Sequence, residues 1–540
     1  MYRLTLILAT ATLLLFGHGL ILNSSAQERS FSELSNASDP LVITIDEAME
    51  IALVHSYSLQ RARLDTEDAD AQISEAWGQV LPSLSASSEF TRNIIDPNPF
   101  AGTQAGTGLF QSLGLIDWVA FNEQARTDGD PDTQPIPLDE FQQLQEEGMR
   151  QAGVQMENGN PFGVPNQFQA GVTVSQTLYN ASAFAAVRGA RQLREVTERG
   201  VDRETQVLLN EVREAFYQAQ LAKEQARIAR LSVDRTQRTF DETARRVSQG
   251  TAPKFERLSA EVQLSNLETN LMEAENAAEL ALDGLKQTLG LPIETPLELR
   301  GSLEEVPSDF DLAHVSVDDA LSTAVMNRPD LRQADLAIEL NEIQRQITRG
   351  QRLPTVSAFA NFSYIGNVPD NRQSVFSDPQ DPFDFQVEDR GFFDNTFWEP
   401  SLSVGLSLSW NIFSGNQTSA QLQRDQLQIQ RAEVDRRELE QGIRLEVEQA
   451  VRNLRTAERR IRSQEQNVET AELNYEFAQR RLNEGVASPI EEREASQQLD
   501  ESRLNYLSAL FDYVMAVSEL ETAIGKPMLP FEDVYRYTSN

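Results

Sequence analysis

Two long segments of the chain carry apolar and small residues at alternating steps of three and four. In the first, residues 183–248, this seam includes Val212, Ala219 and Ala226. Spacing of this kind is typical of long helices that pack against a neighbour. At about 1.5 Å per residue, the segment predicts a rod roughly 100 Å long. Because many seam positions are Ala, we expect the neighbouring helix to lie close.

The second long segment, residues 417–483, repeats the first at a constant offset. Val212 aligns with Val447 and Gly250 with Gly485, without a change of register. A duplication of this kind indicates one elongated unit built from two repeats. Each rod ends at its Gly, and the predicted return helices follow at 254–289 and 489–524.

Both repeats also begin in the same way. A helix, predicted at 46–78 in the first repeat and at 318–350 in the second, is followed by Leu-Pro. Thr44 and Glu47 have the spacing of a capping box, which predicts the start of the first of these helices. The predicted divisions are repeat 1 at 43–300, a linker at 301–314, repeat 2 at 315–527 and a C-terminal tail at 528–540.

After each Leu-Pro, and again before each rod, the pattern changes to alternation. One face is apolar, as in Leu402 and Val404, and the other is small and polar, as in Ser401 and Ser403. For a single segment, a sandwich strand with a solvated face is the simpler interpretation. Four such segments beside two long rods favour transmembrane strands. The predicted strands are 83–94, 167–179, 355–365 and 399–413.

Polar loops rich in Gly, Pro and Asn connect the strands within each repeat. The first, 95–166, contains a segment compatible with a short helix, Leu138–Gln151, and the second, 366–398, is acidic. Long loops on one side of a membrane barrel are usually the outward ones, so we interpret both loops as extracellular.

The N-terminus has the pattern of an export signal. Arg3 precedes an apolar core, and Ser24, Ser25 and Ala26 supply small residues for cleavage. This pattern predicts a signal peptide at 1–26 and a flexible lead at 27–42, with a membrane anchor as the alternative. No later stretch has about 18 consecutive apolar residues, so we expect no membrane-spanning helix in the mature chain.

The composition makes several kinds of functional site unexpected. The chain has 540 residues, no Cys and only three His, which makes a thiolate or histidine metal centre and histidine-based catalysis unexpected. We therefore expect neither a metal site nor a cofactor. The net charge of −36 argues against nucleic-acid binding, because a polyanion would be repelled.

Taken in order, these features resemble the TolC-type outer-membrane factors, also called the outer membrane efflux protein family. These proteins are the exit ducts of bacterial efflux pumps and of type I secretion systems. The resemblance covers nearly the whole mature chain, and it is carried by a turn motif, Gly-x-x-(Ser/Pro)-x-x-(Asp/Glu)-x-x-x-Ala, present in both repeats. The motif stands at Gly250, Pro253, Glu256 and Ala260, and again at Gly485, Ser488, Glu491 and Ala495.

The resemblance implies a mixed α and β membrane protein. In a homotrimer, four strands per protomer form a 12-stranded β-barrel, joined to a long α-helical coiled-coil barrel. Strand pairing independently requires that protomers pool their strands, because four strands cannot close a barrel and an open edge in lipid is prohibitive. The implied location is the outer membrane, with a long periplasmic extension. The implied partners are membrane lipid, a periplasmic adaptor protein and an inner-membrane transporter of the RND or ABC type.

The same resemblance implies a ring of carboxylates that narrows the pore near the second turn. These positions fall on Glu491 and Glu494, with Glu256 at the first turn. An ordinary solvated helix start, stabilised by the helix dipole, is the alternative. The chain departs from the family pattern at Ala487 and Leu482, where an Arg and a Tyr are expected, so another contact has to hold any closed state.

Two further sets of residues follow from the resemblance and the strand pattern. The two turns are expected to form the tip that docks on the adaptor, with Gly250, Thr251, Gly485 and Val486. Aromatic residues near strand ends are expected to form a lipid-facing girdle, comprising Trp410, Phe90, Phe168 and Tyr364.

The favoured function is the outer-membrane channel of a tripartite efflux system, a passive exit duct for small molecules with no enzymatic activity. Type I protein secretion uses the same fold, and the sequence does not separate the two. An exported soluble coiled-coil scaffold is an alternative that predicts strand faces exposed to water. A carboxylate-based hydrolase is the least favoured hypothesis, because no cleft-forming pattern accompanies the acidic pairs.

Overall fold

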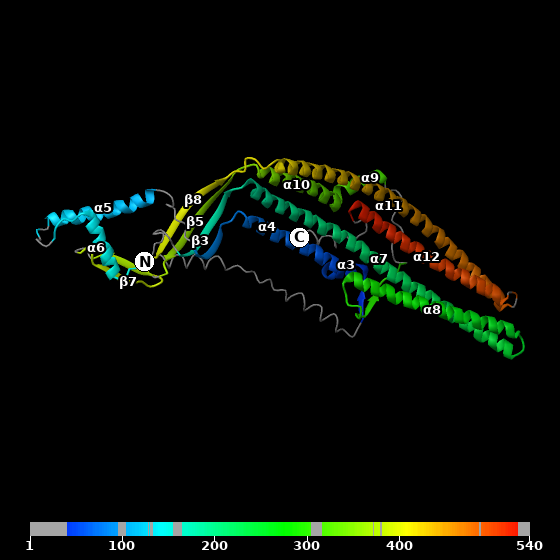
Figure 1. Cartoon of the computed structure of the whole chain (residues 1–540). Helices are drawn as coiled ribbons and strands as arrows, with labels where there is room; N and C mark the ends of the chain where they lie inside the picture. The colour runs from blue at the N-terminus through cyan, green and yellow to red at the C-terminus, as the bar shows by residue number, and fades with distance from the viewer. Residues whose placement is uncertain are drawn as a thin grey trace. The chain divides into compact units, whose positions relative to one another are not determined.

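The computed structural model describes residues 40–94, 104–127, 129, 133–154, 165–303, 316–370, 372–377, 381–484, 486 and 488–526 (Figure 1). The chain divides into two compact units. The helical unit comprises Met1–Ile73, Arg188–Arg345 and Gln421–Asn540, and the strand unit comprises Ser74–Val187 and Gln346–Ala420. The expected signal peptide and C-terminal tail lie outside the described residues, as does the linker from residue 304 onward.

Long helices dominate the helical unit. They are α7 (Ala181–Ser248), α8 (Lys254–Leu289), α11 (Gln417–Asn483) and α12 (Pro489–Ile524). Neither rod, α7 or α11, contains Pro, so its backbone hydrogen bonding is uninterrupted. Ion pairs join each rod to its return helix, Arg230 to Glu275 and Arg460 to Asp512. In the part of the chain described here, no helix is both long and apolar enough to cross a membrane.

The seam predicted from the sequence lies in the core of the helical unit. Val212 on α7 and its repeat Val447 on α11 are fully buried, and so are Leu208 and Leu454. All four belong to one hydrophobic cluster. Burying a side chain of this size stabilises the fold by about 1.5–3 kcal/mol relative to leaving it in water. The duplicated pattern therefore produces one shared core.

The single helix predicted at 46–78 is wrong. The segment forms α3 (Ile45–His55) and α4 (Tyr57–Gly78), separated by Ser56 with extended backbone angles (φ −59°, ψ 131°). The bend brings the His55 carbonyl against Gly290 at the end of α8, where a Cβ would lie 2.3 Å from that oxygen. Close packing against a distant part of the chain therefore accompanies the break.

The single helix predicted at 318–350 is also wrong, since the segment forms α9 (Val317–Asn327) and α10 (Pro329–Gly350). The ring of Pro329 disfavours helical angles at the preceding residue, Arg328, which is extended. The buried Arg328 guanidinium pairs with Asp330 at 2.6 Å and with Glu446 on α11 at 2.7 Å. The break between α9 and α10 thus places the Arg328 guanidinium inside the helical unit.

A short parallel sheet lies in the helical unit. It pairs β1 (Leu41–Ile43) with β4 (Leu297–Leu299). The lead predicted to be flexible through residue 42 is therefore a strand from Leu41 onward. Ile43, Leu297 and Leu299 are buried, so apolar burial holds β1 and β4 in place.

The strand unit contains one antiparallel sheet in the order β2–β3–β5–β8. Its strands are β2 (Ser83–Arg92), β3 (Asn166–Tyr179), β5 (Thr355–Val368) and β8 (Trp398–Ser409). The register aligns Leu84, Val174, Ala360 and Val404 across the sheet. Because side chains alternate along a strand, most apolar positions of the four strands share one face and most polar positions share the other, where Phe359 and Ile365 are the exceptions.

Both predicted loops contain regular structure. The first holds α5 (Gln104–Thr127) and α6 (Leu138–Gln151), and the second holds the hairpin of β6 (Gln373–Ser377) and β7 (Phe385–Asp389). The bounds of α6 are those suggested by the sequence, whereas α5 and the hairpin were not predicted. The second loop is also shorter than 366–398, because β5 continues to Val368.

Candidate functional site

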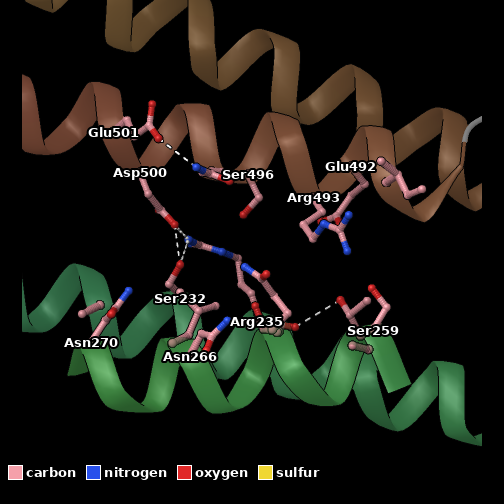
Figure 2. Close-up of a pocket in the computed structure, with 18 of the residues that line it drawn as sticks. Ser232, Arg235, Ser259, Asn266, Asn270, Glu492, Arg493, Ser496, Asp500 and Glu501 are labelled. Atoms are coloured by element: carbon pink, nitrogen blue, oxygen red, sulfur yellow. Dashed lines mark hydrogen bonds and ion pairs between the residues drawn. The ribbon is translucent and has the colours of Figure 1, made fainter. Parts of the chain in front are cut away.

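A cavity of about 800 Å³ lies between the α7–α8 hairpin and α12 (Figure 2). Its polar lining includes Arg235 on α7, Asn270 on α8 and Arg493 on α12, while Phe255 and Leu504 contribute apolar surface. The cavity lies close to the two turns where the sequence analysis expected the pore constriction.

A largely buried ion pair spans this cavity. The Arg235 guanidinium contacts both carboxylate oxygens of Asp500, and the Ser232 hydroxyl donates to Asp500 Oδ2 at 2.6 Å (Figure 2). The Arg235 and Asp500 side chains are only 22 % and 12 % exposed. Breaking a buried pair by removing one partner typically costs about 3–5 kcal/mol, because the other charge is left without compensation. The pair therefore ties α12 to α7.

Glu492, in the first turn of α12, faces the same cavity and is half-buried. Burial raises the pKa of its carboxyl, while a hydrogen bond from the Tyr475 hydroxyl and the nearby Arg235 charge oppose that shift. Burial likewise raises the pKa of Tyr475 on α11, and the neighbouring Glu492 charge raises it further. Glu492 thus couples α11 and α12 to the Arg235 pair.

The three carboxylates expected at the constriction have different surroundings. Glu491 and Glu494 are exposed on α12, and Glu491 pairs with Arg481 of α11 at 3.3 Å. Glu256 is half-buried on α8 and lines the cavity. Within the described residues of one chain, no three carboxylate or His side chains are grouped so as to hold a metal ion.

The first turn has a backbone that favours Gly. Gly250 has a φ of +75°, and no atom lies within 4 Å of a Cβ placed there. A larger residue at this position is therefore disfavoured by the backbone conformation and not by a clash with neighbouring atoms. Thr251 donates to the Arg246 carbonyl through both its N–H and its hydroxyl, at 2.9 and 3.0 Å. In the second turn Val486 is exposed, and Gly485 lies outside the described residues.

The expected girdle residues lie at two ends of the sheet. At one end Phe90 stacks on Phe168, with ring centroids 4.5 Å apart, and Tyr364 stacks on Trp398 at 5.5 Å. At the other end, just past β8, Trp410 Nε1 donates to the Arg352 carbonyl at 3.0 Å. Trp398 was missed because the strand was predicted to begin one residue later.

Arg235, Asp500 and Ser232 were not predicted from the sequence. Each belongs to the polar pattern of its own helix, and Arg235 and Asp500 are 265 positions apart. The one available signal was the departure from the family pattern at Ala487 and Leu482, which required some other contact between the helices.

Comparisons with known proteins agree with this architecture. Among solved structures, the chain is similar to the Campylobacter jejuni CmeC outer membrane channel, with a TM-score of 0.65 and 13 % identity, covering 92 % of this chain and 89 % of that one. It is also similar to the outer membrane protein VceC of Vibrio cholerae, with a TM-score of 0.60 and 14 % identity, covering 90 % of this chain and 97 % of that one. At such identities the likeness establishes a shared fold. No curated protein matches the chain.

The model of the outer membrane efflux protein family matches residues 148–291 and 320–526. The match includes the second part of repeat 1 and most of repeat 2, and it covers more than half of the chain. The chain therefore belongs to the outer membrane efflux protein family.

Proposed function

We propose that this chain is the outer-membrane channel of a tripartite efflux system, a passive exit duct for small molecules. The observation that carries the proposal is the exposed apolar face of the sheet. On β8 alone, Leu402, Val404, Leu406 and Leu408 are between 68 % and 77 % exposed. An apolar face of this kind is unfavourable in water and suits the hydrocarbon of a bilayer.

The length of the strands supports a membrane setting. β8 has 12 residues, and at about 3.4 Å per residue it is about 40 Å long. With a tilt of about 40°, typical of membrane barrels, such a strand rises about 30 Å, close to the thickness of the hydrocarbon layer. The aromatic groups around Trp398 and Trp410 lie at its two ends, where the membrane interfaces would be.

The edges of the sheet support an assembly of several copies. Within the described chain, β2 and β8 each pair on one side only. In lipid, an unpaired edge leaves backbone groups without hydrogen bonds, at several kcal/mol each. We place β8 of one protomer beside β2 of the next in a homotrimer, which yields a closed barrel of twelve strands continued by a tube of helices.

The proposed orientation places the helices in the periplasm. The turns at Gly250, Thr251, Gly485 and Val486 then form the tip that docks on a periplasmic adaptor, and an inner-membrane transporter of the RND or ABC type supplies the energy. Exposed Val486 and the hydrogen-bonded turn at Gly250 and Thr251 suit a docking surface.

The proposed constriction is formed by Glu491 and Glu494 of α12, with Glu256 of α8 as the third carboxylate. Because Arg481 partly neutralises Glu491, Glu494 contributes more strongly to attracting cations. The Arg235–Asp500 pair takes the place of the family contacts missing at Ala487 and Leu482, and it holds α12 in the closed arrangement.

The test is fractionation of cells that express the full chain, followed by recording in planar bilayers. We expect a heat-modifiable trimer in the outer-membrane fraction that forms ion-conducting channels. A monomer released with the soluble periplasmic proteins would contradict the proposal and favour the scaffold. Restored resistance to small toxic compounds in a host lacking its own duct would separate efflux from protein secretion.

A further inference from the structure

The two loops at the end of the sheet remote from α4 and α7 fold together into one small subdomain, the cap, formed by α5, α6 and the β6–β7 hairpin. Its centre is a triad of rings from three segments, Phe121, Phe141 and Phe383, with centroids 5.2–5.6 Å apart. A Cβ on Gly148 of α6 would lie 2.0 Å from the Phe383 carbonyl oxygen, so α6 packs directly on the hairpin (Figure 1). The cap is therefore a packed element.

One side of α5 is used inside the cap. Trp118 Nε1 donates to the Ile136 carbonyl at 2.8 Å, and the Asn122 side chain makes two hydrogen bonds to the Ile136 backbone, at 2.9 and 2.8 Å. Asn122 and Ala125 are buried, and Phe121 contributes to the ring triad. This side anchors α5.

On a second side of α5, the apolar side chains between Leu115 and Val119 are uncovered, and the exposed Glu123–Arg126 ion pair follows on the same side. Leu115, Ile116 and Val119, hereafter the α5 stripe, are 39 %, 63 % and 56 % exposed. From Leu115 to Asn122 the only charged residue is Asp117. A helix that is apolar on more than one side is normally buried by its surroundings. We therefore expect another molecule or another segment of the chain to cover the α5 stripe.

The charges of the cap disfavour a lipid surface as that occupant. Helices that lie on membranes are rich in Lys and Arg on their polar face. The cations of α5 and α6 are limited to Arg126 and Arg150, and both are already paired, with Glu123 and Glu147. The remaining charged side chains of the two helices are acidic and would be repelled by anionic head groups.

The connectivity of the chain favours a second copy. The β2 strand leads into α5, and β2 is an edge of the sheet, at which the proposed function places the neighbouring protomer. In a ring of three, every cap stands at the same end of the barrel, so three α5 stripes are arranged around one three-fold axis, where each can meet its own copies. An apolar surface repeated around a symmetry axis can be buried against its own copies.

We infer that the α5 stripe is a contact between copies of this chain, through which three caps assemble into a lid over the outer mouth of the barrel. The inference rests on the proposed function, which supplies the trimer. It adds a second barrier to the one proposed at Glu491 and Glu494, formed by apolar packing instead of carboxylates.

The test uses the absence of native Cys from the chain. Purified trimers of V119C, and separately of I116C, are oxidised and run on non-reducing gels. We expect covalent dimers from both, because each stripe meets its copy. The matched control is Q124C, on an exposed side of α5 outside the stripe, which is expected to lack the dimer band.

The outcomes separate the lid from the duct. Intact V119C and I116C trimers without covalent dimers overturn the lid and leave the duct standing. A fluorophore attached to V119C provides a second test. If brominated lipid quenches its fluorescence, α5 lies in the membrane and the inferred lid is wrong. If the unsubstituted chain forms no trimer, the proposed function itself fails. If Val119→Asp still forms trimers but its channels conduct more than those of the wild type, the result supports the lid as a barrier.

Discussion

The Arg235 guanidinium on α7 and the Asp500 carboxylate on α12 form a largely buried pair that joins the first repeat of the chain to the second. From Glu491 to Asp500, α12 rises about 14 Å. The pair therefore lies within a few helical turns of the proposed constriction. A change that loosens it is expected to act on both the stability of the helical unit and the closed state of the pore.

Asp500→Ala removes one partner and leaves the Arg235 charge largely buried. We expect the free energy of unfolding to fall by about 3–5 kcal/mol, and the channel to open more often. Denaturant titration of the purified protein and planar-bilayer recording measure the two effects. The matched control is Glu275→Ala, which breaks an exposed pair with Arg230 and is expected to cost about 0–1 kcal/mol. Equal effects of the two substitutions would show that the Arg235–Asp500 pair does not hold α12 against α7.

Glu492 predicts a pH dependence. Its pKa is raised in the folded protein, so the folded state binds the proton more tightly than the unfolded state. The helical unit is therefore expected to lose stability as pH rises from the ordinary carboxyl value of 4.5 through the raised folded value. Glu492→Gln, which stays neutral and can still accept from Tyr475, should raise the melting temperature at neutral pH and flatten this trend. Glu494→Gln, which changes an exposed carboxylate, serves as the control. A melting temperature of Glu492→Gln that equals that of the wild type at every pH would contradict a raised pKa of Glu492 in the folded protein.

The two faces of the sheet should respond differently to charge. Val404→Arg places a cation on the apolar face, and we expect a cost of about 2–4 kcal/mol near the middle of the bilayer, with loss of inserted trimer. Ser403→Arg, one residue away on the polar face, should assemble normally and alter ion selectivity. Trimer yield in the outer-membrane fraction is the measurement. Equal yields from the two variants would mean that the apolar face does not contact lipid.

Removing the proposed constriction should change conduction. Glu491→Ala combined with Glu494→Ala is expected to reduce cation selectivity and raise conductance, because converging carboxylates concentrate cations. The wild-type channel should also be blocked by divalent cations from the periplasmic side, since these ions prefer carboxylate oxygen. Reversal potentials and block curves test both points. If the double variant keeps the block, the constriction lies elsewhere in the tube.

Replacing Gly by Ala should change the stability of the protein in opposite directions at two positions, one in the turn after α7 and one inside α7. Gly250→Ala puts a Cβ on a residue with a φ of +75°, and we expect a loss of about 1–2 kcal/mol of stability. Gly200 lies inside α7, where an added Cβ meets only the Gln333 side chain at 3.4 Å. Gly200→Ala should therefore stabilise the protein by about 0.5–1 kcal/mol. Melting temperatures of the two variants test the pair; shifts of the same sign would contradict the backbone argument.

The repetitive parts of the architecture follow from local patterns. The seam through Val212 and Val447 predicts two rods, because the helical period places those residues on one face. The alternation from Leu402 to Leu408 predicts a strand with an apolar face for the same kind of reason. The predicted return helices agree with α8 and α12 in their bounds, since Gly and Pro or Ser at the turns are strong local signals.

Other features depend on contacts between distant segments. The bend at Ser56 accompanies the approach of Gly290, and α5 is held by the ring triad that includes Phe383. The Arg235–Asp500 pair likewise joins positions that share no spacing or motif. Periodicity along a chain records which face of an element is apolar, and so the sequence by itself determined the rods, the strands and their faces. Which polar side chains meet depends on how those faces pack in three dimensions, and so only the tertiary structure decided the Arg235–Asp500 pair, the cavity and the cap.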